Sequence, residues 1–268
     1  MIDKASILNN VNLDDTPLPA SSYNQLPHID DMSDVATQHC HAHVLLLKLI
    51  TSHGLSDKFS VHLIHKHFDL LQGRVMVYES VQEKHLPDFT LCCPRRPEQV
   101  TDLRGLYFRA THDGKMAAYE YTTEPADDIS AHADFVAAFA HTVLSLGVHN
   151  VFALTVQGTH QGLLTEFEMT DLQSTVLVDN AEVSLPVAAD QTSTSTDWVA
   201  NTRPDDTSGS NNLGVVNMMC TSSRKHGHRQ RLVRDGEAGE LLLNDYPLAK
   251  DSAVFAVIAC ARNMVKAF

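Results

Sequence analysis

Short stretches in which apolar and polar residues alternate, separated by turn-forming residues, recur along this chain and restrict its fold most strongly. Alternation with a period of two places apolar side chains on one face of a β-strand. The stretches 103–110 and 115–122 flank His112-Asp113-Gly114. An Asp-Gly step favours a tight hairpin, because the turn requires positive φ angles. Further strand-like stretches lie at 59–68, 74–81, 151–157, 163–169 and 174–184.

Two segments have the apolar spacing of α-helices. Residues 130–146 begin at a Ser130 cap and end at Gly147, and residues 35–52 show a similar period. The apolar segment 253–268 fits either a helix or a strand. Two helices among short strands that mostly follow one another by hairpins predict an α+β fold. We expect a mainly antiparallel curved sheet of short strands with two principal helices, in which 59–68 forms a hairpin with 74–81.

Composition divides the chain into a polar N-terminal arm, 1–33, and a single main domain, 34–268. The arm contains proline and Asp-rich patches, so we expect it to be extended or loosely packed. Residues 187–212 combine Ser, Thr, Asp, Asn and Gly and offer little to bury apart from Trp198, the only tryptophan. We therefore expect a mobile insertion there, which could contain one short strand around Trp198.

The formal net charge of −13 opposes binding to nucleic acid or anionic membranes, because both require Lys and Arg to neutralise phosphates. The first residues lack the apolar stretch of a signal peptide, and no run approaches the roughly 20 apolar residues of a membrane helix. Five cysteines without a CxxC pair indicate free thiols in a reducing compartment. We expect a cytoplasmic protein with neither nucleic-acid nor membrane partners, whose oligomeric state the sequence leaves open.

Histidine density marks the candidate site, because seven of the sixteen histidines fall between positions 39 and 67. Histidine is the commonest metal ligand and titrates near neutral pH. On a strand, His65 and His67 would point the same way, and on a helix so would His39 and His43. Packing the helix on the strand would bring both pairs together, so these four residues form the predicted site for a divalent transition metal, such as Zn, Fe or Cu. The alternative is four hydrogen-bonded or half-exposed histidines.

Other residues could supply proton transfer at this site. His65 and His67 extend an apolar strand face, where a buried imidazole needs a partner, so they are predicted to be catalytic as well. Glu166 is the candidate general acid because a second carboxylate, Glu168, would raise its pKa if the pair were buried; the alternative is a solvated strand face. Tyr119 could donate from its phenol. By the same alternation, His41 and His62 are predicted to face solvent.

A basic segment, 224–234, contains His226 and His228 within this acidic chain. It could bind a carboxylate or phosphate group, or, with Cys220, a metal. The alternative is a flexible basic loop, and the role of the segment stays open.

Several common chemistries lack their motifs: the chain has no GxSxG, GxxxxGK[ST], GxGxxG after a strand, or HExxH. The stretch VHLIHKHFDLLQGRVMVYE, followed by GVHNVFALTVQG and the basic segment, resembles poorly characterised fungal proteins with an LLHRHF-like strand. The resemblance spans about residues 35 to 230 and implies no activity, although a fungal source would favour specialised metabolism.

Two functional hypotheses follow. The first is an intracellular enzyme that acts on a small-molecule substrate by lyase, dehydratase, isomerase or cyclase chemistry, through imidazole acid–base catalysis or a bound divalent metal. The second is a non-catalytic protein that binds metal or carries a ligand. Several ligated, exposed histidines would favour the second hypothesis, and one enclosed pocket would favour the first.

Overall fold

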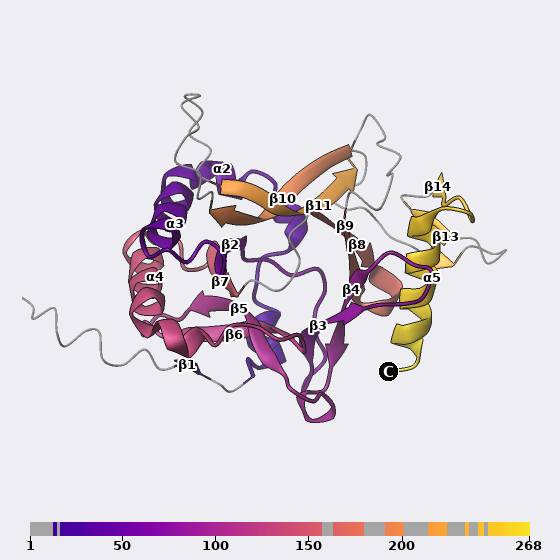
Figure 1. The fold of residues 1–268 in the computed structure, drawn as a ribbon, viewed down its shortest axis with the longest axis horizontal. Coiled ribbons are helices and arrows are strands. Elements are labelled where there is room, and N and C mark those ends of the chain that lie inside the picture. The colour runs from indigo at the N-terminus through magenta and orange to yellow at the C-terminus, as the bar shows by residue number, and fades with distance from the viewer. Residues whose placement is uncertain are drawn as a thin grey trace, which may run out of the picture.

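The computed structural model is dominated by one curved sheet with helices packed on its outside (Figure 1). The residues described are 13–14, 17–156, 163–179, 191–200, 214–223, 234–235, 241–243 and 246–268. The predicted basic segment 224–234 lies outside the described residues, except for Arg234.

The main sheet has 11 strands, in the order β1-β6-β3-β4-β9-β8-β11-β10-β2-β7-β5. Because β5 also pairs with β6, ten of these strands form a closed ring of hydrogen-bonded ladders, with β1 added at β6. The strands are β1 (Leu13–Asp14), β2 (Phe59–Leu63), β3 (Val75–Val81), β4 (Phe89–Arg95), β5 (Arg104–Ala110), β6 (Met116–Thr122), β7 (Phe152–Val156), β8 (Leu164–Met169), β9 (Ser174–Asp179), β10 (Gln191–Ala200) and β11 (Gly214–Ser223).

The remaining elements are helices and one small sheet. The small sheet contains β12 (Arg234–Asp235), β13 (Leu241–Leu243) and β14 (Tyr246–Pro247). The α-helices are α1 (Ala20–Tyr23), α2 (Val35–Gln38), α3 (Cys40–Ser52), α4 (Ala133–Ser145) and α5 (Ala253–Lys266). Short 3₁₀ turns are η1 (Ile29–Asp31), η2 (Pro97–Gln99), η3 (Ile129–His132) and η4 (Thr170–Leu172).

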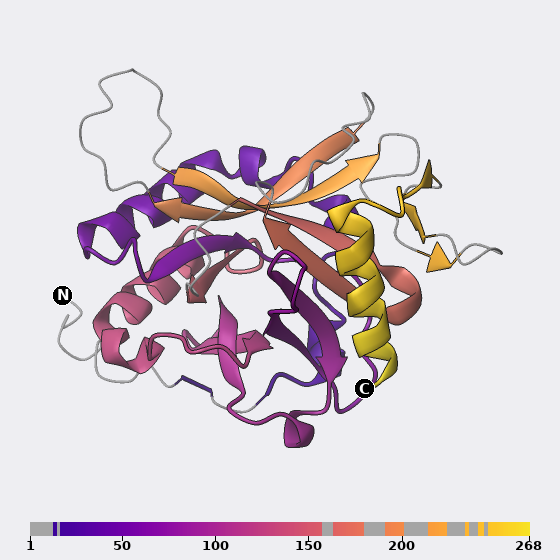
Figure 2. The same ribbon diagram turned by 45° about the vertical axis from the view of Figure 1, so that its right-hand side comes forward.

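The core is divided by the ring into an inside and two outer layers. Helices α3 and α4 lie on one outer side, and α5 lies on the opposite side (Figures 1 and 2). The outer faces of the strands pack against these helices: Phe59 and Phe139 belong to the first layer, and Phe167 and Ile258 to the second. A third cluster, which includes Tyr78 and Tyr107, fills the inside. In β2, for example, alternation sends Phe59, Val61 and Leu63 under the helices and leaves His62 facing into the ring.

The sheet is mixed, so the prediction of an α+β fold with a mainly antiparallel sheet and two principal helices is wrong. Strand β6 pairs in parallel with β1 and β3, and β8 pairs in parallel with β11. Strands make up most of the regular structure described, and α5 is as long as α3 and α4. Alternation identifies strands, but it carries no information about which distant strands become neighbours when the sheet curls.

The two predicted hairpins had opposite outcomes. The hairpin around Asp113-Gly114 is confirmed, because β5 and β6 are antiparallel and Gly114 has φ +84°. The hairpin between 59–68 and 74–81 is wrong. Strand β2 pairs with β7 and β10, while β3 pairs with β4 and β6.

Two segments that look polar in the sequence supply buried side chains. Within the predicted arm 1–33, Tyr23 and Ile29 are buried at 1% and 2% exposure. Within the predicted insertion 187–212, residues 191–200 form β10 between β11 and β2, and Trp198 is buried; the rest lies outside the described residues. Threonine is β-branched and suits a strand despite its polarity.

Candidate functional site

Polar side chains gather on the inner face of the ring. Four carboxyl groups are buried there at 3–5% exposure: Glu120, Glu166, Glu168 and Asp197. Burying a carboxyl group costs free energy unless it finds hydrogen bonds, a cation or a proton. The enclosed polar cluster is therefore the candidate functional site, and its parts come from β2, β6, β8, β10 and the segment after β2.

The chain leaves β2 after Leu63, and this departure brings His65 and His67 into the cluster. The amide of Ile64 donates to the Val151 carbonyl, and the amide of Lys66 donates to the Pro27 carbonyl. Because the strand ends at Leu63, the prediction that these two histidines share a strand face is wrong. They instead lie in a turn held against the N-terminal segment.

The ring of His65 is fixed in one tautomer by its backbone. Its Nδ1 lies 2.7 Å from the Leu63 carbonyl, which can only accept a hydrogen bond, so Nδ1 carries the hydrogen. Burial, followed by the charges of His67 and His62, lowers the pKa of His65 to about 3. The imidazole is therefore neutral near pH 7, and its Nε2 presents a lone pair to the cluster.

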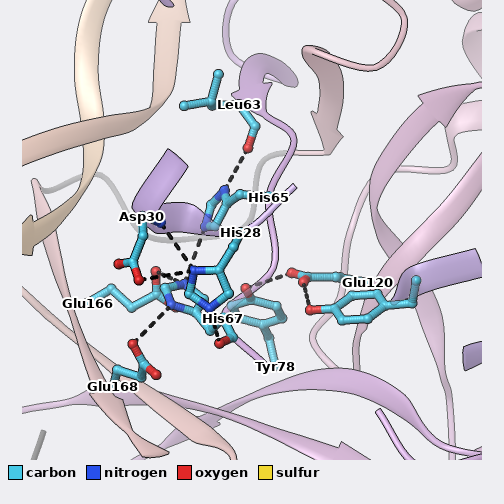
Figure 3. A network of polar contacts seen from close by, with 10 residues as sticks. His28, Asp30, Leu63, His65, His67, Tyr78, Glu120, Glu166 and Glu168 are labelled. Carbon is cyan, nitrogen blue, oxygen red and sulfur yellow. Dashed lines mark hydrogen bonds and ion pairs between the residues drawn. The ribbon is translucent and has the colours of Figure 1, made fainter. Parts of the chain in front are cut away.

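Three ligand atoms converge at this point (Figure 3). His65 Nε2 lies 3.3 Å from His67 Nε2, and His67 Nε2 lies 3.0 Å from Glu166 Oε2. All three atoms lie within 4.8 Å of one another. Ligands at 2.0–2.1 Å from a tetrahedral zinc ion are separated by about 3.3 Å. The arrangement therefore has the dimensions of a metal centre with two histidines and one carboxylate.

Further contacts orient these ligands. Glu168 Oε2 lies 3.8 Å from His67 Nδ1, whereas Glu166 contacts the other nitrogen of the same imidazole. His28 Nε2 donates to the His67 carbonyl at 2.7 Å, and His28 Nδ1 accepts from the Asp30 amide at 3.2 Å. Carboxylates and carbonyls behind ligating histidines set their tautomer and direction. Here His28 holds the backbone of His67, and the Glu168 carboxylate lies near its imidazole ring, beyond hydrogen-bond distance.

A carboxyl group held between two phenols occupies another part of the interior (Figure 3). Tyr23 Oη donates to Glu120 Oε1 at 2.8 Å, and Tyr78 Oη donates to Glu120 Oε2 at 2.7 Å. Burial raises the pKa of Glu120 despite these two hydrogen bonds. Burial likewise raises the pKa of both tyrosines well above the usual value. Glu120 can therefore hold a proton at a higher pH than an exposed glutamate can.

His62 and Asp197 form a third arrangement. His62 Nδ1 lies 3.5 Å from Asp197 Oδ2, which accepts a 2.8 Å hydrogen bond from Thr155. The His62 ring stacks on Tyr107, with centroids 3.9 Å apart. At 1% exposure, His62 is buried, so its predicted solvent exposure is wrong. The change of direction at Ile64 places His62 and His65 on the same side, which strict alternation forbids.

The predicted residues are only partly brought together. His65, His67 and Glu166 converge, and Tyr119 lies on the same inner face, 6.5 Å from the His62 ring. His39 and His43 do not join them. His39 lies at the junction of α2 and α3.

His43 packs outside the ring, 4.5 Å from Trp198 and 5.5 Å from Phe152 between ring centroids. The side chains of β2 that face these helices point away from the inner cluster. His43 therefore lies on the opposite side of the sheet from His65 and His67.

Sequence reasoning missed His28 and Asp197 altogether. His28 lies in the segment predicted to be an arm, and Asp197 lies in the polar stretch predicted to be an insertion. Their roles depend on contacts with residues 39 and 135 positions away in the chain: His28 with His67, and Asp197 with His62. Trp198 had suggested a short strand there, and the alternating threonines before Asp197 were a further signal for it.

Comparison with protein-family models, with curated proteins and with solved structures finds no match to this chain. The comparisons therefore supply no relative that would test the resemblance to fungal proteins. Among the described residues, no helix has both the length and the apolar character that crossing a membrane requires.

Proposed function

We propose that this protein is an enzyme that acts on a small molecule by lyase or isomerase chemistry, using a divalent transition metal held by His65, His67 and Glu166. The observation that carries the proposal is the convergence of three ligand atoms, within 4.8 Å, in a buried site. Dehydratase and cyclase reactions belong to the same chemistry, because each moves a proton and shifts electrons next to a polarised group.

The donor set favours a transition metal over calcium or magnesium. Two imidazole ligands suit Zn, Fe or Cu, whereas Ca²⁺ and Mg²⁺ prefer oxygen ligands. Three protein ligands also leave open a position that a substrate oxygen can occupy, as catalytic sites require. A metal in this position would act as a Lewis acid on a carbonyl or hydroxyl group.

Groups that can move protons surround the proposed metal. Glu120, with its raised pKa, can serve as a general acid or hold a proton for Tyr78 to pass on. His62 lies beside a second buried carboxylate, because its Nδ1 is 3.5 Å from Asp197 Oδ2. A lyase or isomerase needs one group that removes a proton and another that returns one. The inner face offers both kinds of group.

The competing hypothesis of metal storage has less support in the geometry. Storage predicts several ligated, exposed histidines, but the described residues contain one cluster of three possible ligands, and two of them, His65 and Glu166, are buried. His41, which the storage hypothesis needs, is exposed on α3, away from that cluster. We therefore expect one tightly bound metal ion per chain.

The metal can be tested before any substrate is known. Protein produced without a His-tag is stripped with a chelator and titrated with Zn²⁺ and Co²⁺ by calorimetry and absorption spectroscopy. We expect one site per chain, lost or weakened at least about 10-fold in His67→Gln and Glu166→Gln. His41→Gln is the matched control and should bind like the wild type. Equal binding by all four proteins would overturn the metal centre.

The reaction class needs a separate measurement. Small enolisable ketones and 3-hydroxy acids, incubated with the zinc-loaded protein in D₂O, are followed by NMR for exchange of a C–H proton or loss of water. Turnover that depends on Glu166 would support the proposal. If turnover survives without metal and still requires His65 and His67, imidazole acid–base catalysis replaces the metal mechanism.

A further inference from the structure

Arg109 lies on the inner face of the ring, at the end where β2 finishes. Its neighbours on β5, Phe108 and Ala110, both belong to the outer cluster under the helices. Strand alternation therefore directs Arg109 inward. Its positive charge also acts on the buried Tyr119 phenol, whose pKa it lowers against the larger effect of burial. Arg109 is thus a cation on the wall of the proposed active site.

No hydrogen bond or ion pair of the Arg109 side chain occurs within the described part of the chain, and its Nε is buried. This sets Arg109 apart from other partly buried basic residues. Arg95 pairs with Glu79 at 2.8 Å, and Arg262 pairs with Asp171 at 2.6 Å. In a chain with net charge −13, a half-buried arginine whose Nε is buried and which has no carboxylate partner among the described residues is unusual. A guanidinium group offers five donors in a fixed fork that matches a carboxylate.

Small and unpaired groups surround Arg109. Ala117 is its cross-strand partner on β6, and Ala153, also on the inner face, is the cross-strand partner of His62. Tyr119 Oη, also buried, has no hydrogen-bond partner in the described structure. Alanine is the smallest side chain after glycine, so these positions place little bulk on the inner face, and the Tyr119 phenol supplies one more donor. The surroundings therefore suit a bound anion.

Two histidines extend this basic region at the rim. The rings of His112 and His149 are 4.6 Å apart, and neither ring nitrogen of His149 has a hydrogen-bond partner among the described residues. Arg109 lies close enough to affect the titration of His149. An anion that enters at this end of the ring would therefore meet donors before it reaches Arg109.

We infer that the substrate is a small monocarboxylate, whose carboxylate group pairs with Arg109 while its other end reaches the metal. The inference rests on the proposed function only for the contact between the substrate and the metal. A phosphate is disfavoured because, among the described residues, the inner face holds four buried carboxyl groups and only the Arg109 guanidinium group has been placed there to balance them. A dianion would meet more repulsion there than a monoanion.

The test uses benzoate, its uncharged analogue benzamide and inorganic phosphate as probes, with calorimetry on the full chain. We expect benzoate to bind, and its Kd to rise at least about 10-fold in Arg109→Gln. Arg104→Gln removes an exposed arginine from the same strand and should leave the Kd unchanged. Arg109→Lys keeps the charge but loses the two parallel hydrogen bonds, so it should give a smaller increase. If Arg109→Gln does not fold, Arg109→Lys decides the test.

Each titration is run on zinc-loaded and on chelator-treated protein. Benzoate binding that requires zinc and His67 but is unchanged in both Arg109 variants would overturn the inference and leave the proposed metal centre intact. Arg109-dependent binding in a protein that takes up no zinc would support the inference and count against the metal centre. Tighter binding of phosphate or benzamide than of benzoate would overturn the choice of a monocarboxylate.

Discussion

The Nε2 atoms of His65 and His67 lie 3.3 Å apart, and the Leu63 carbonyl 2.7 Å from His65 Nδ1 determines how the pair can act. Because the Nδ1–H of His65 donates to that carbonyl, its Nε2 has a free lone pair. The two imidazoles can therefore share one proton or one metal ion at their Nε2 atoms. Glu166 lies 3.0 Å from His67 Nε2 and supplies the negative charge that favours a cation there.

Adding the metal should stabilise the folded protein. A ligand that binds only the native state adds about 2.7 kcal/mol to the free energy of unfolding at 100 times its Kd. Zinc should therefore raise the Tm of chelator-treated wild-type protein measured by circular dichroism. His67→Gln should show no such rise. An equal rise in that variant would place the bound zinc elsewhere.

Glu168→Gln tests the orientation of His67. The Glu168 carboxylate lies 3.8 Å from His67 Nδ1. Residues that support a metal ligand typically contribute 10- to 100-fold to metal affinity. We expect a zinc Kd increased by about that factor, and less than in Glu166→Gln. Competition with a coloured chelator measures the zinc Kd. Glu98→Gln, at an exposed position, is the matched control. The orienting role would be contradicted if the two variants bound zinc equally.

Tyr23→Phe should destabilise the fold by about 1–3 kcal/mol. The change removes a 2.8 Å hydrogen bond to the buried Glu120 carboxyl group and leaves that group with one phenol partner. Urea denaturation gives the free energy of unfolding. In the double variant Tyr23→Phe/Glu120→Gln, the two losses should not add, because both act on one contact. Strictly additive losses would show that the contact contributes little.

His43 should make stability fall in acid. Burial lowers its folded pKa to about 4, whereas the unfolded value is about 6.5. The unfolded chain then binds more protons between these values, so this contribution to stability is present above pH 6.5 and is lost as the pH falls towards 4. Glutamine cannot be charged, so the Tm of His43→Gln should depend less on pH in this window. His41→Gln, at an exposed position, is the control. Parallel Tm profiles for wild type and His43→Gln would contradict the prediction.

Phe139→Ala should cost about 3–5 kcal/mol, because the ring is fully buried between α4 and the outer face of the sheet. Denaturation in urea measures the loss. Leu71→Ala removes a side chain with 65% exposure and should change stability by less than about 0.5 kcal/mol. Similar losses in both variants would mean that α4 does not cover the core as described.

Local chemistry determined part of the site before any tertiary contact was known. Strand alternation and the Asp113-Gly114 turn correctly predicted the β5–β6 hairpin, because such a turn depends on neighbouring residues only. Histidine spacing selected His65 and His67, and paired carboxylates selected Glu166. These residue types are rare on apolar stripes, so their positions were informative by themselves.

Tertiary structure decided which of these residues meet. The chain leaves β2 after Leu63, so His65 and His67 join His62 on the inner face, whereas His43 on α3 stays outside. Closure of the ring creates the parallel ladders and places Asp197 and Arg109 on the same inner face as Glu166, although they are far apart in the chain. Residue patterns encode side-chain periods over a few positions. Neighbours across a curled sheet depend on the packing free energy of the whole fold, which no local period contains.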